Sequence, residues 1–154
     1  MTTTMTLAEL ERAGDRELGT SDWHEITQDQ INQFAQATGD HQWIHVDPER
    51  AADGPFGTTV AHGYLTLSML PMLLSEVVSV SDAVMGVNYG TEKIRFTSPV
   101  PSGSRVRLHA KLVRAERRGP SVVWTVGVEV EIEGKEKPAL VGEVVYMAAG
   151  APGA

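Results

Sequence analysis

Alternating apolar and polar side chains in the second half of the chain constrain its fold most strongly. In residues 105–112 one face is polar, and the opposite face carries Val106, Leu108, Ala110 and Leu112. The same period recurs over residues 122–132, and residues 139–147 follow as a last apolar stretch; glycine and proline mark the intervening turns. Because successive side chains of a strand point to opposite faces, this pattern predicts consecutive antiparallel strands with one buried face.

The stretch before these strands, residues 63–79, is apolar almost all round, which is typical of a helix enclosed by a sheet. Pro71 has no backbone N–H, so it predicts a kink or a break into two helices. Polar side chains at His62, Thr66 and Glu76 favour a buried helix over a membrane span. Residues 84–96 are expected to add a further strand, with glycines marking bends in it.

The first half predicts shorter elements. Thr27 and Gln30 match a capping box, so a helix should start there and end at Gly39. Residues 43–47 should be extended because Pro48 disfavours helical geometry before it, and a short helix is expected from Pro48 to Ala52. A helix over residues 7–13, a strand over 23–26 and a loop over 54–57 complete the expectation. Helices followed by antiparallel strands indicate an α+β fold with the helices on one face of the sheet.

Length and charge narrow the possible classes of protein. A chain of 154 residues fits a single domain over 1–154, with residues 1–20 as an N-terminal extension and 149–154 as a flexible tail. Thirteen basic and 20 acidic residues give a net charge of −7, which disfavours nucleic-acid and anionic-membrane partners. The absence of cysteine excludes disulfides and thiolate metal sites. No secretory signal pattern opens the chain, so a cytoplasmic location is expected.

Two short motifs contain residues capable of acid–base chemistry. Asp40 follows the predicted helix end and precedes His45 by five positions, and His62 and Gly63 open the apolar helix. Taken separately, each has a structural explanation: a capping aspartate, a hydrogen-bonded histidine, and a glycine that lets the chain enter a helix. A zincin-type metal site would use His41 and His45, but it requires a helix and a glutamate where Gln42 stands, so no metal is expected.

The order of these motifs resembles the MaoC-like, R-specific enoyl-CoA hydratases. Residues 37–48 (ATGDHQWIHVDP) resemble the hydratase motif, residues 56–63 (FGTTVAHG) the second landmark of the family, and residues 94–106 the third. The resemblance implies a hot-dog fold, in which a curved antiparallel sheet wraps around a long central helix and the chain forms a homodimer. It assigns the acid–base pair to Asp40 and His45, and the oxyanion donor to the N–H of Gly63. Gln42 and Trp43 stand where the family motif has Asn-Pro, and Gln42 still offers an amide.

The resemblance therefore implies that the protein adds water to a trans-2-enoyl thioester and forms the (R)-3-hydroxyacyl thioester. The substrate would be an acyl-CoA or an acyl-carrier-protein thioester, with no cofactor. Candidate substrate-binding residues are Gln42, Trp43, His62 and Tyr89, with packing as the alternative for Trp43 and Tyr89. A hot-dog acyl-CoA thioesterase and a non-catalytic acyl-thioester-binding member stay open. Basic side chains could form a mouth for CoA phosphates or a solvated sheet face: Arg95, Arg105, Arg107 and Lys111.

Overall fold

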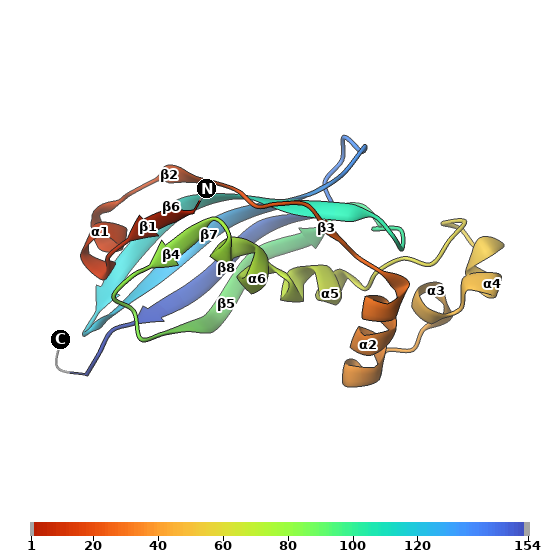
Figure 1. Cartoon of the computed structure of the whole chain (residues 1–154), viewed down its shortest axis with the longest axis horizontal. Helices are drawn as coiled ribbons and strands as arrows, with labels where there is room; N and C mark the ends of the chain where they lie inside the picture. The colour runs from red at the N-terminus through yellow and green to blue at the C-terminus, as the bar shows by residue number, and fades with distance from the viewer. Residues whose placement is uncertain (1, 153–154) are drawn as a thin grey trace.

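A computed structural model describes residues 2–152 and shows a curved antiparallel sheet that wraps around two short helices (Figure 1). The sheet has six strands; five follow the order β2-β6-β7-β8-β5, and β3 also pairs with β6. Their bounds are β2 (Arg16–Thr20), β3 (His24–Glu25), β5 (Met85–Phe96), β6 (Arg105–Arg118), β7 (Ser121–Ile132) and β8 (Leu140–Ala149). The predicted α+β class and the consecutive antiparallel strands are confirmed.

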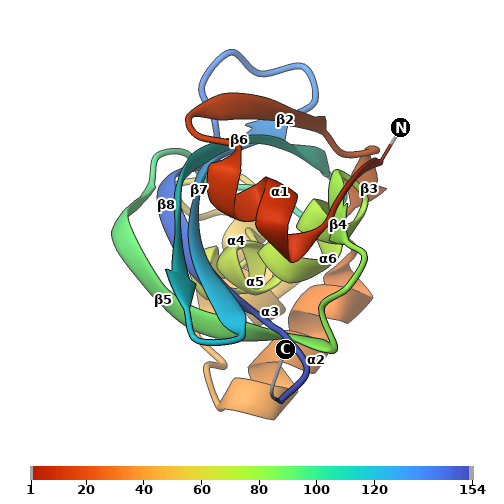
Figure 2. The ribbon, with the colours of Figure 1, turned by 90° about the vertical axis from the view of Figure 1, so that its left-hand side faces the viewer.

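The apolar segment forms two helices on the concave face of the sheet, α5 (Gly63–Ser68) and α6 (Leu70–Ser75), and Figure 2 shows the strands curling around them. Pro71 lies in the first turn of α6, where its missing N–H costs no intrahelical bond, so the predicted break is confirmed. The expected end of the helical stretch near residue 79 is wrong. The chain leaves α6 at Ser75 and forms β4 (Val78–Val80), because β1 (Thr3–Met5) pairs with it in parallel.

The predicted alternation of β6 and β7 produces the core. The inward side chains of β6 are at most 2% exposed, and alternate residues of β7 from Val122 to Ile132 are buried as well. They face leucines of α5 and α6, among them Leu65, Leu70 and Leu73. Each such side chain contributes about 1.5–3 kcal/mol when fully buried, so this sheet–helix contact accounts for much of the stability.

The segment expected as an N-terminal extension takes part in this packing. Residues 3–20 form β1, α1 (Leu7–Arg12) and β2, which pairs with β6 at one edge of the sheet. Helix α1 packs against β6 and β7, and Leu10 is fully buried. At the other end of the chain, Ala149 closes β8 and is buried, whereas residues 153–154 of the expected tail lie outside the described residues.

Three helices, α2 (Gln28–Thr38), α3 (Trp43–Val46) and α4 (Pro48–Ala52), extend beyond one end of the sheet (Figure 1). Thr27 Oγ1 accepts a hydrogen bond from Gln30 N at 3.1 Å, and Gly39 ends α2 with φ of 85°, as the capping pattern predicts. The start of α4 at Pro48 is also as predicted. No helix within residues 2–152 has the length and apolar content needed to cross a membrane.

The prediction of an extended segment over residues 43–47 is wrong for most of its length. Only Asp47, which directly precedes Pro48, is extended, with φ of −117° and ψ of 91°. Proline restricts the residue before it but not those further upstream. Residues 43–46 instead close a helical turn, in which Asp47 N donates to Trp43 O at 3.1 Å.

Candidate active site

Asp40 lies at the point where the chain turns away from α2. The left-handed conformation of Gly39 ends the helix and directs the next residue outward, so Asp40 is exposed. Its backbone N–H donates to Thr38 Oγ1 at 3.4 Å, and its Oδ1 accepts a hydrogen bond from Gln42 N at 3.3 Å. These local bonds orient the carboxylate while leaving it accessible to a small molecule.

His45 is buried in α3, with 7% of its surface exposed. Its Nδ1 lies 2.7 Å from the backbone oxygen of Val60. Because a carbonyl can only accept a hydrogen bond, Nδ1 carries the proton, and Nε2 of the neutral ring carries a lone pair. The imidazole is therefore held in the tautomer that can accept a proton at Nε2.

A polar link fixes α3 in this position. The Gln28 amide nitrogen donates to His45 O at 2.8 Å, and Thr59 Oγ1 donates to the Gln28 amide oxygen at 2.5 Å. Val60 N also donates to Ile44 O at 2.9 Å. The backbone on both sides of the His45 imidazole is thus tied to α2 and to the segment that leads into α5. Sequence reasoning missed Gln28, which the pattern shows only as part of a helix cap.

His62 joins the same cluster. Its ring stacks on that of His45, with 3.9 Å between the ring centroids and 23° between the planes. Its Nε2 lies 3.0 Å from the backbone oxygen of Asp40. Ligand-type atoms of Asp40, His45 and His62 all lie within 4.8 Å of one another. The structure therefore brings together three residues that the sequence motifs singled out separately.

This cluster also has the composition of a metal site, since it offers two imidazoles and a carboxylate. The two rings stack nearly parallel, with 23° between their planes and 3.9 Å between their centroids. Two imidazoles that bind one ion approach it from different directions. The geometry favours acid–base chemistry over metal binding, and the absence of a metal stays a prediction.

Gly63 is the first residue of α5, where the backbone N–H has no acceptor within the helix. A Cβ atom at this position would lie 2.8 Å from Cγ of Phe96, so a larger residue would displace the ring or the backbone. A hollow of about 240 Å³ opens beside it, and its lining includes Phe56, Thr66 and Ser98. Gly63 therefore lies next to space that a small acyl group can enter.

The other predicted substrate-binding residues occupy different surroundings. Gln42 is exposed and precedes α3. Trp43 is half-buried, with the Arg50 guanidinium carbon 4.3 Å from its ring centroid, and its ring packs closely on Gly54. Tyr89 lies on β5 with 52% of its surface exposed, and its hydroxyl accepts a hydrogen bond from Arg118 at 2.9 Å. Trp43 makes packing contacts and Tyr89 lies outside the Asp40 cluster, and a role of either in substrate binding stays a prediction.

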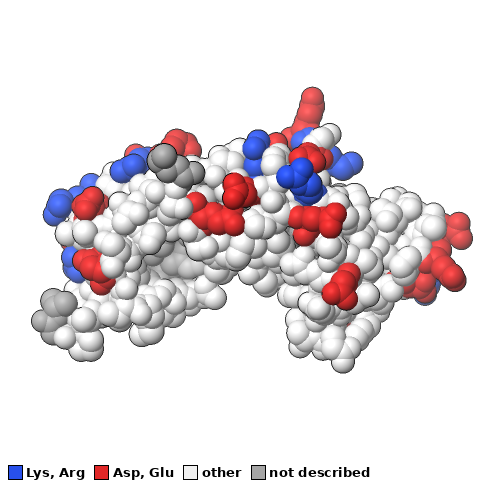
Figure 3. Space-filling model, viewed as in Figure 1, with Lys and Arg blue, Asp and Glu red and all other residues white. Residues whose placement is uncertain are grey.

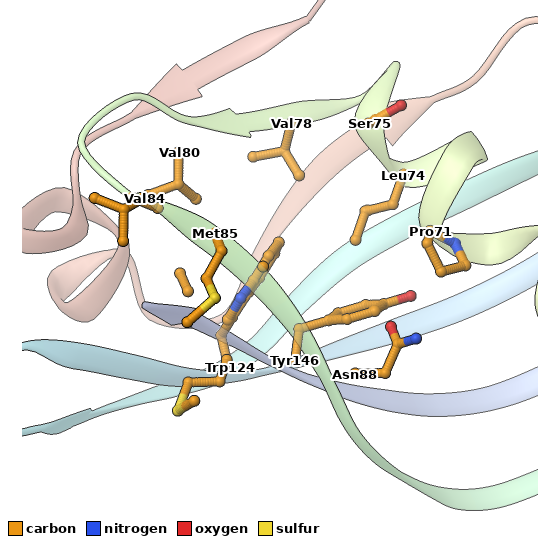
Figure 4. Close-up of a pocket in the computed structure, with 14 residues that line it drawn as sticks. Pro71, Leu74, Ser75, Val78, Val80, Val84, Met85, Asn88, Trp124 and Tyr146 are labelled. Atoms are coloured by element: carbon orange, nitrogen blue, oxygen red, sulfur yellow. The ribbon is translucent and has the colours of Figure 1, made fainter. Parts of the chain in front are cut away.

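A second cavity, of about 320 Å³, was not foreseen from the sequence. It lies between α6 and strands β5, β7 and β8, and Figure 4 shows Leu74, Met85, Trp124 and Tyr146 around it. Burial raises the pKa of Tyr146 to about 12, so its phenol stays protonated. Trp124 is buried on the inward face of β7, and it also lines this cavity. The alternation of apolar and polar residues predicts that Trp124 and Tyr146 lie on particular faces of the sheet. It does not reveal that the small residues beside them leave a cavity.

Three of the four basic side chains proposed for a cationic mouth are held in ion pairs, and the fourth, Arg95, donates to Ile94 O at 2.9 Å. Arg105 pairs with Glu133, Arg107 with Glu131, and Lys111 with Asp15. Two hydrogen bonds hold the pKa of Glu131 below its usual range: the one from Arg107 has the larger effect, and the one from His109 the smaller. On the face drawn in Figure 3, Lys and Arg lie beside Asp and Glu along the upper border. The interpretation as a solvated sheet face fits these ion pairs.

Comparison with known proteins places this arrangement in a family. The chain is 52% identical over 146 residues to 3-hydroxyacyl-thioester dehydratase Z of Mycobacterium tuberculosis. The aligned region covers 94% of this chain and 97% of that protein. It is 48% identical over 139 residues to nodulation protein N of Rhizobium leguminosarum bv. viciae, covering 88% and 86% of the two chains.

A solved structure, R-hydratase PhaJ1 from Pseudomonas aeruginosa in the unliganded form, superposes with a TM-score of 0.74 at 23% identity. The superposition covers 96% of this chain and 87% of that one, which confirms the predicted hot-dog fold. Residues 9–133 match the family described as MaoC like domain. Since this match spans most of the chain, the protein belongs to the MaoC-like domain family.

Proposed function

We propose that this protein is an R-specific hydro-lyase that interconverts a trans-2-enoyl thioester and the (R)-3-hydroxyacyl thioester. Membership of the MaoC-like family and the similarity to a 3-hydroxyacyl-thioester dehydratase support this reaction. The observation that carries the proposal is the hydrogen bond between His45 Nδ1 and Val60 O, because it leaves Nε2 as a proton acceptor beside an accessible carboxylate. Hydration requires a base that takes a proton from water and a neighbouring group that orients the water and relays the proton.

In the hydration direction, a water molecule is held between Asp40 and His45. His45 Nε2 takes a proton from the water as its oxygen bonds to C3 of the substrate. The C2–C3 π electrons move onto the thioester oxygen, where the Gly63 N–H stabilises the enolate; a donor of this kind is worth about a hundredfold or more in rate. The same proton then passes from His45 through Asp40 to C2, which restores the thioester and the neutral imidazole. Oxygen and hydrogen balance without any redox step, so the reaction itself requires no cofactor.

The experiment is a hydration assay on crotonyl-CoA and on longer enoyl-CoA substrates, followed by loss of the enoyl absorbance and by chiral analysis of the product. Asp40→Asn and His45→Gln should each lose activity by about a hundredfold or more, while His109→Gln should retain it. His109 is a matched control because it pairs with Glu131 on the sheet surface. Variants that hydrate as fast as the unmodified protein would overturn the roles of Asp40 and His45.

The same assay separates the two alternatives. Release of free CoA thiol without hydration would identify a thioesterase, and binding of the enoyl thioester without turnover would identify a non-catalytic member. Enoyl groups carried by CoA and by acyl-carrier protein should be compared, because a thioester substrate is common to both carriers. A cytoplasmic location, and the absence of nucleic-acid and membrane partners, stay predictions from the sequence.

We also propose that the chain forms a homodimer through β5. This strand lies at the edge of the sheet, pairs only with β8 among the strands of residues 2–152, and exposes most of its 12 residues. Exposed apolar side chains lie on it or just before it, including Val84, Met85 and Tyr89. A long edge strand with apolar side chains readily pairs with another chain. Two copies of β5 would extend the sheet continuously across a two-fold axis.

Light scattering of the purified protein tests the dimer. The unmodified chain should have twice the mass of one chain, and Met85→Glu with Tyr89→Glu should shift the mass toward that of a monomer. Thr20→Glu on β2, at the opposite edge of the sheet, is the control and should leave the dimer intact. A monomeric unmodified protein, or a charged β5 variant that stays fully dimeric, would contradict this interface.

A further inference from the structure

We propose that His62 is a positioning residue. Its buried imidazole holds Asp40 and His45 in a fixed arrangement relative to each other and makes no contact with the substrate. The inference rests on the proposed function of that site. It differs from the sequence expectation, which placed His62 among the substrate-binding residues.

Burial separates His62 from any substrate. Only 2% of its surface is exposed, and its ring is held between Phe34 and His45. The Phe34 centroid lies 4.9 Å away at 54°, and the His45 centroid lies 3.9 Å away at 23°. Nδ1 of His62 is buried without a hydrogen-bond partner among the described residues. Neither ring face nor this nitrogen is therefore open to a bound thioester.

The remaining nitrogen connects His62 to the catalytic carboxylate residue. Nε2 lies 3.0 Å from the backbone oxygen of Asp40, and because this oxygen only accepts, the proton of the neutral ring is on Nε2. This hydrogen bond joins residues 22 positions apart in the sequence and fixes the backbone of Asp40. The other hydrogen bonds of Asp40 are to residues two positions away. The side chain of Asp40 is exposed, so its placement depends on this backbone anchor.

The stacked face connects His62 to the proposed base. His45 is held at Nδ1 by the hydrogen bond to Val60 O. The flat ring of His62 against it restricts the tilt of the imidazole and hence the direction of Nε2. His62 also directly precedes Gly63 as the N-cap residue of α5, although its side chain makes no hydrogen bond to that helix. One side chain thereby contacts both Asp40 and His45.

Two substitutions remove these two contacts one at a time. His62→Phe keeps a flat ring against His45 but removes the donor to Asp40 O, and His62→Gln keeps an amide N–H but removes the stack. Each should lower kcat by about ten- to a hundredfold with KM changed less than about threefold, since misplacing catalytic groups by about 1 Å costs rate and not ground-state binding. Phe34→Leu, which reduces packing on the other face of His62 and leaves both contacts, should change kcat less than about fivefold.

A double-mutant cycle tests whether His62 acts through Asp40. In the Asp40→Asn background, His62→Phe should cost much less than it does alone, because residues that act as one unit are not additive. Additive losses would overturn the link to Asp40. A rise in KM of more than about tenfold with unchanged kcat would make His62 a substrate contact instead.

The outcomes separate this inference from the proposed function. If the unmodified protein hydrates no enoyl thioester, the proposed function fails; if it does so and His62→Phe and His62→Gln both retain its kcat, only the positioning role fails. Thermal unfolding of each variant identifies loss of fold. Should His62→Phe fail to fold, His62→Gln decides the question, because its polar side chain can still donate to Asp40 O.

Discussion

Replacement of Gly63 by alanine tests how closely the start of α5 is packed. The added Cβ would lie 2.8 Å from Cγ and 2.9 Å from Cδ2 of Phe96, well inside van der Waals contact. Phe96 is 44% exposed, so its ring can retreat, and the cost should be near the low end of the range for overpacking, about 1 kcal/mol. Alanine is a better helix former than glycine by up to about 1 kcal/mol, so the melting temperature should change little.

Activity should respond more strongly than stability. If the backbone at Gly63 moves away from Phe96 by even part of the overlap, its N–H no longer points at the thioester oxygen. Complete loss of such a donor costs about a hundredfold or more, so a displaced donor should lower kcat by about tenfold. Steady-state hydration of crotonyl-CoA, measured beside a thermal melt, gives both quantities for the same protein.

A second substitution distinguishes the steric explanation from others. Phe96→Ala removes the ring that the new Cβ would meet, so Gly63→Ala with Phe96→Ala should recover to within a few-fold of Phe96→Ala alone, as coupled neighbours do. An alanine variant with full activity would refute the argument for a required glycine. A double variant no better than Gly63→Ala would refute the role of Phe96.

Three further predictions follow from contacts outside this packing. Gln28→Ala should lower kcat by about tenfold, because α3 loses its tie at His45 O, whereas the exposed control Gln33→Ala should not. Leu108→Ala should cost about 2–5 kcal/mol in a denaturant titration, because this side chain is fully buried. Glu131→Gln should cost at most about 1 kcal/mol near neutral pH, since Glu131 is partly exposed. The pKa of the Glu131 carboxylate is lowered in the folded state, so its stabilisation is present above the ordinary pKa and disappears as the pH falls through the folded-state pKa. The unmodified protein and the variant should therefore melt at different temperatures at neutral pH and at equal temperatures at acidic pH.

The sequence predicted elements that depend on neighbours along the chain. Thr27 and Gly39 bound α2 because capping groups act within one helical turn, and Pro71 breaks the apolar helix because it lacks an N–H. The error at residues 43–46 has the same origin, since the effect of Pro48 reaches only one residue back. Where the helix after Pro71 ends was not predictable locally, because β4 forms by pairing with β1 at the far end of the chain.

What the sequence alone determined is the family, the alternating faces of the sheet, and the identity of Asp40, His45 and Gly63 as candidates. Only the tertiary structure decided how they act together. The tautomer of His45 depends on a carbonyl 15 residues away, and the position of Asp40 on an imidazole 22 residues away. Spacing along the chain carries no information on such contacts, because they form only when α3, the segment before α5 and the end of α2 pack against one another. His62 could be recognised as a buried support only once that packing was known.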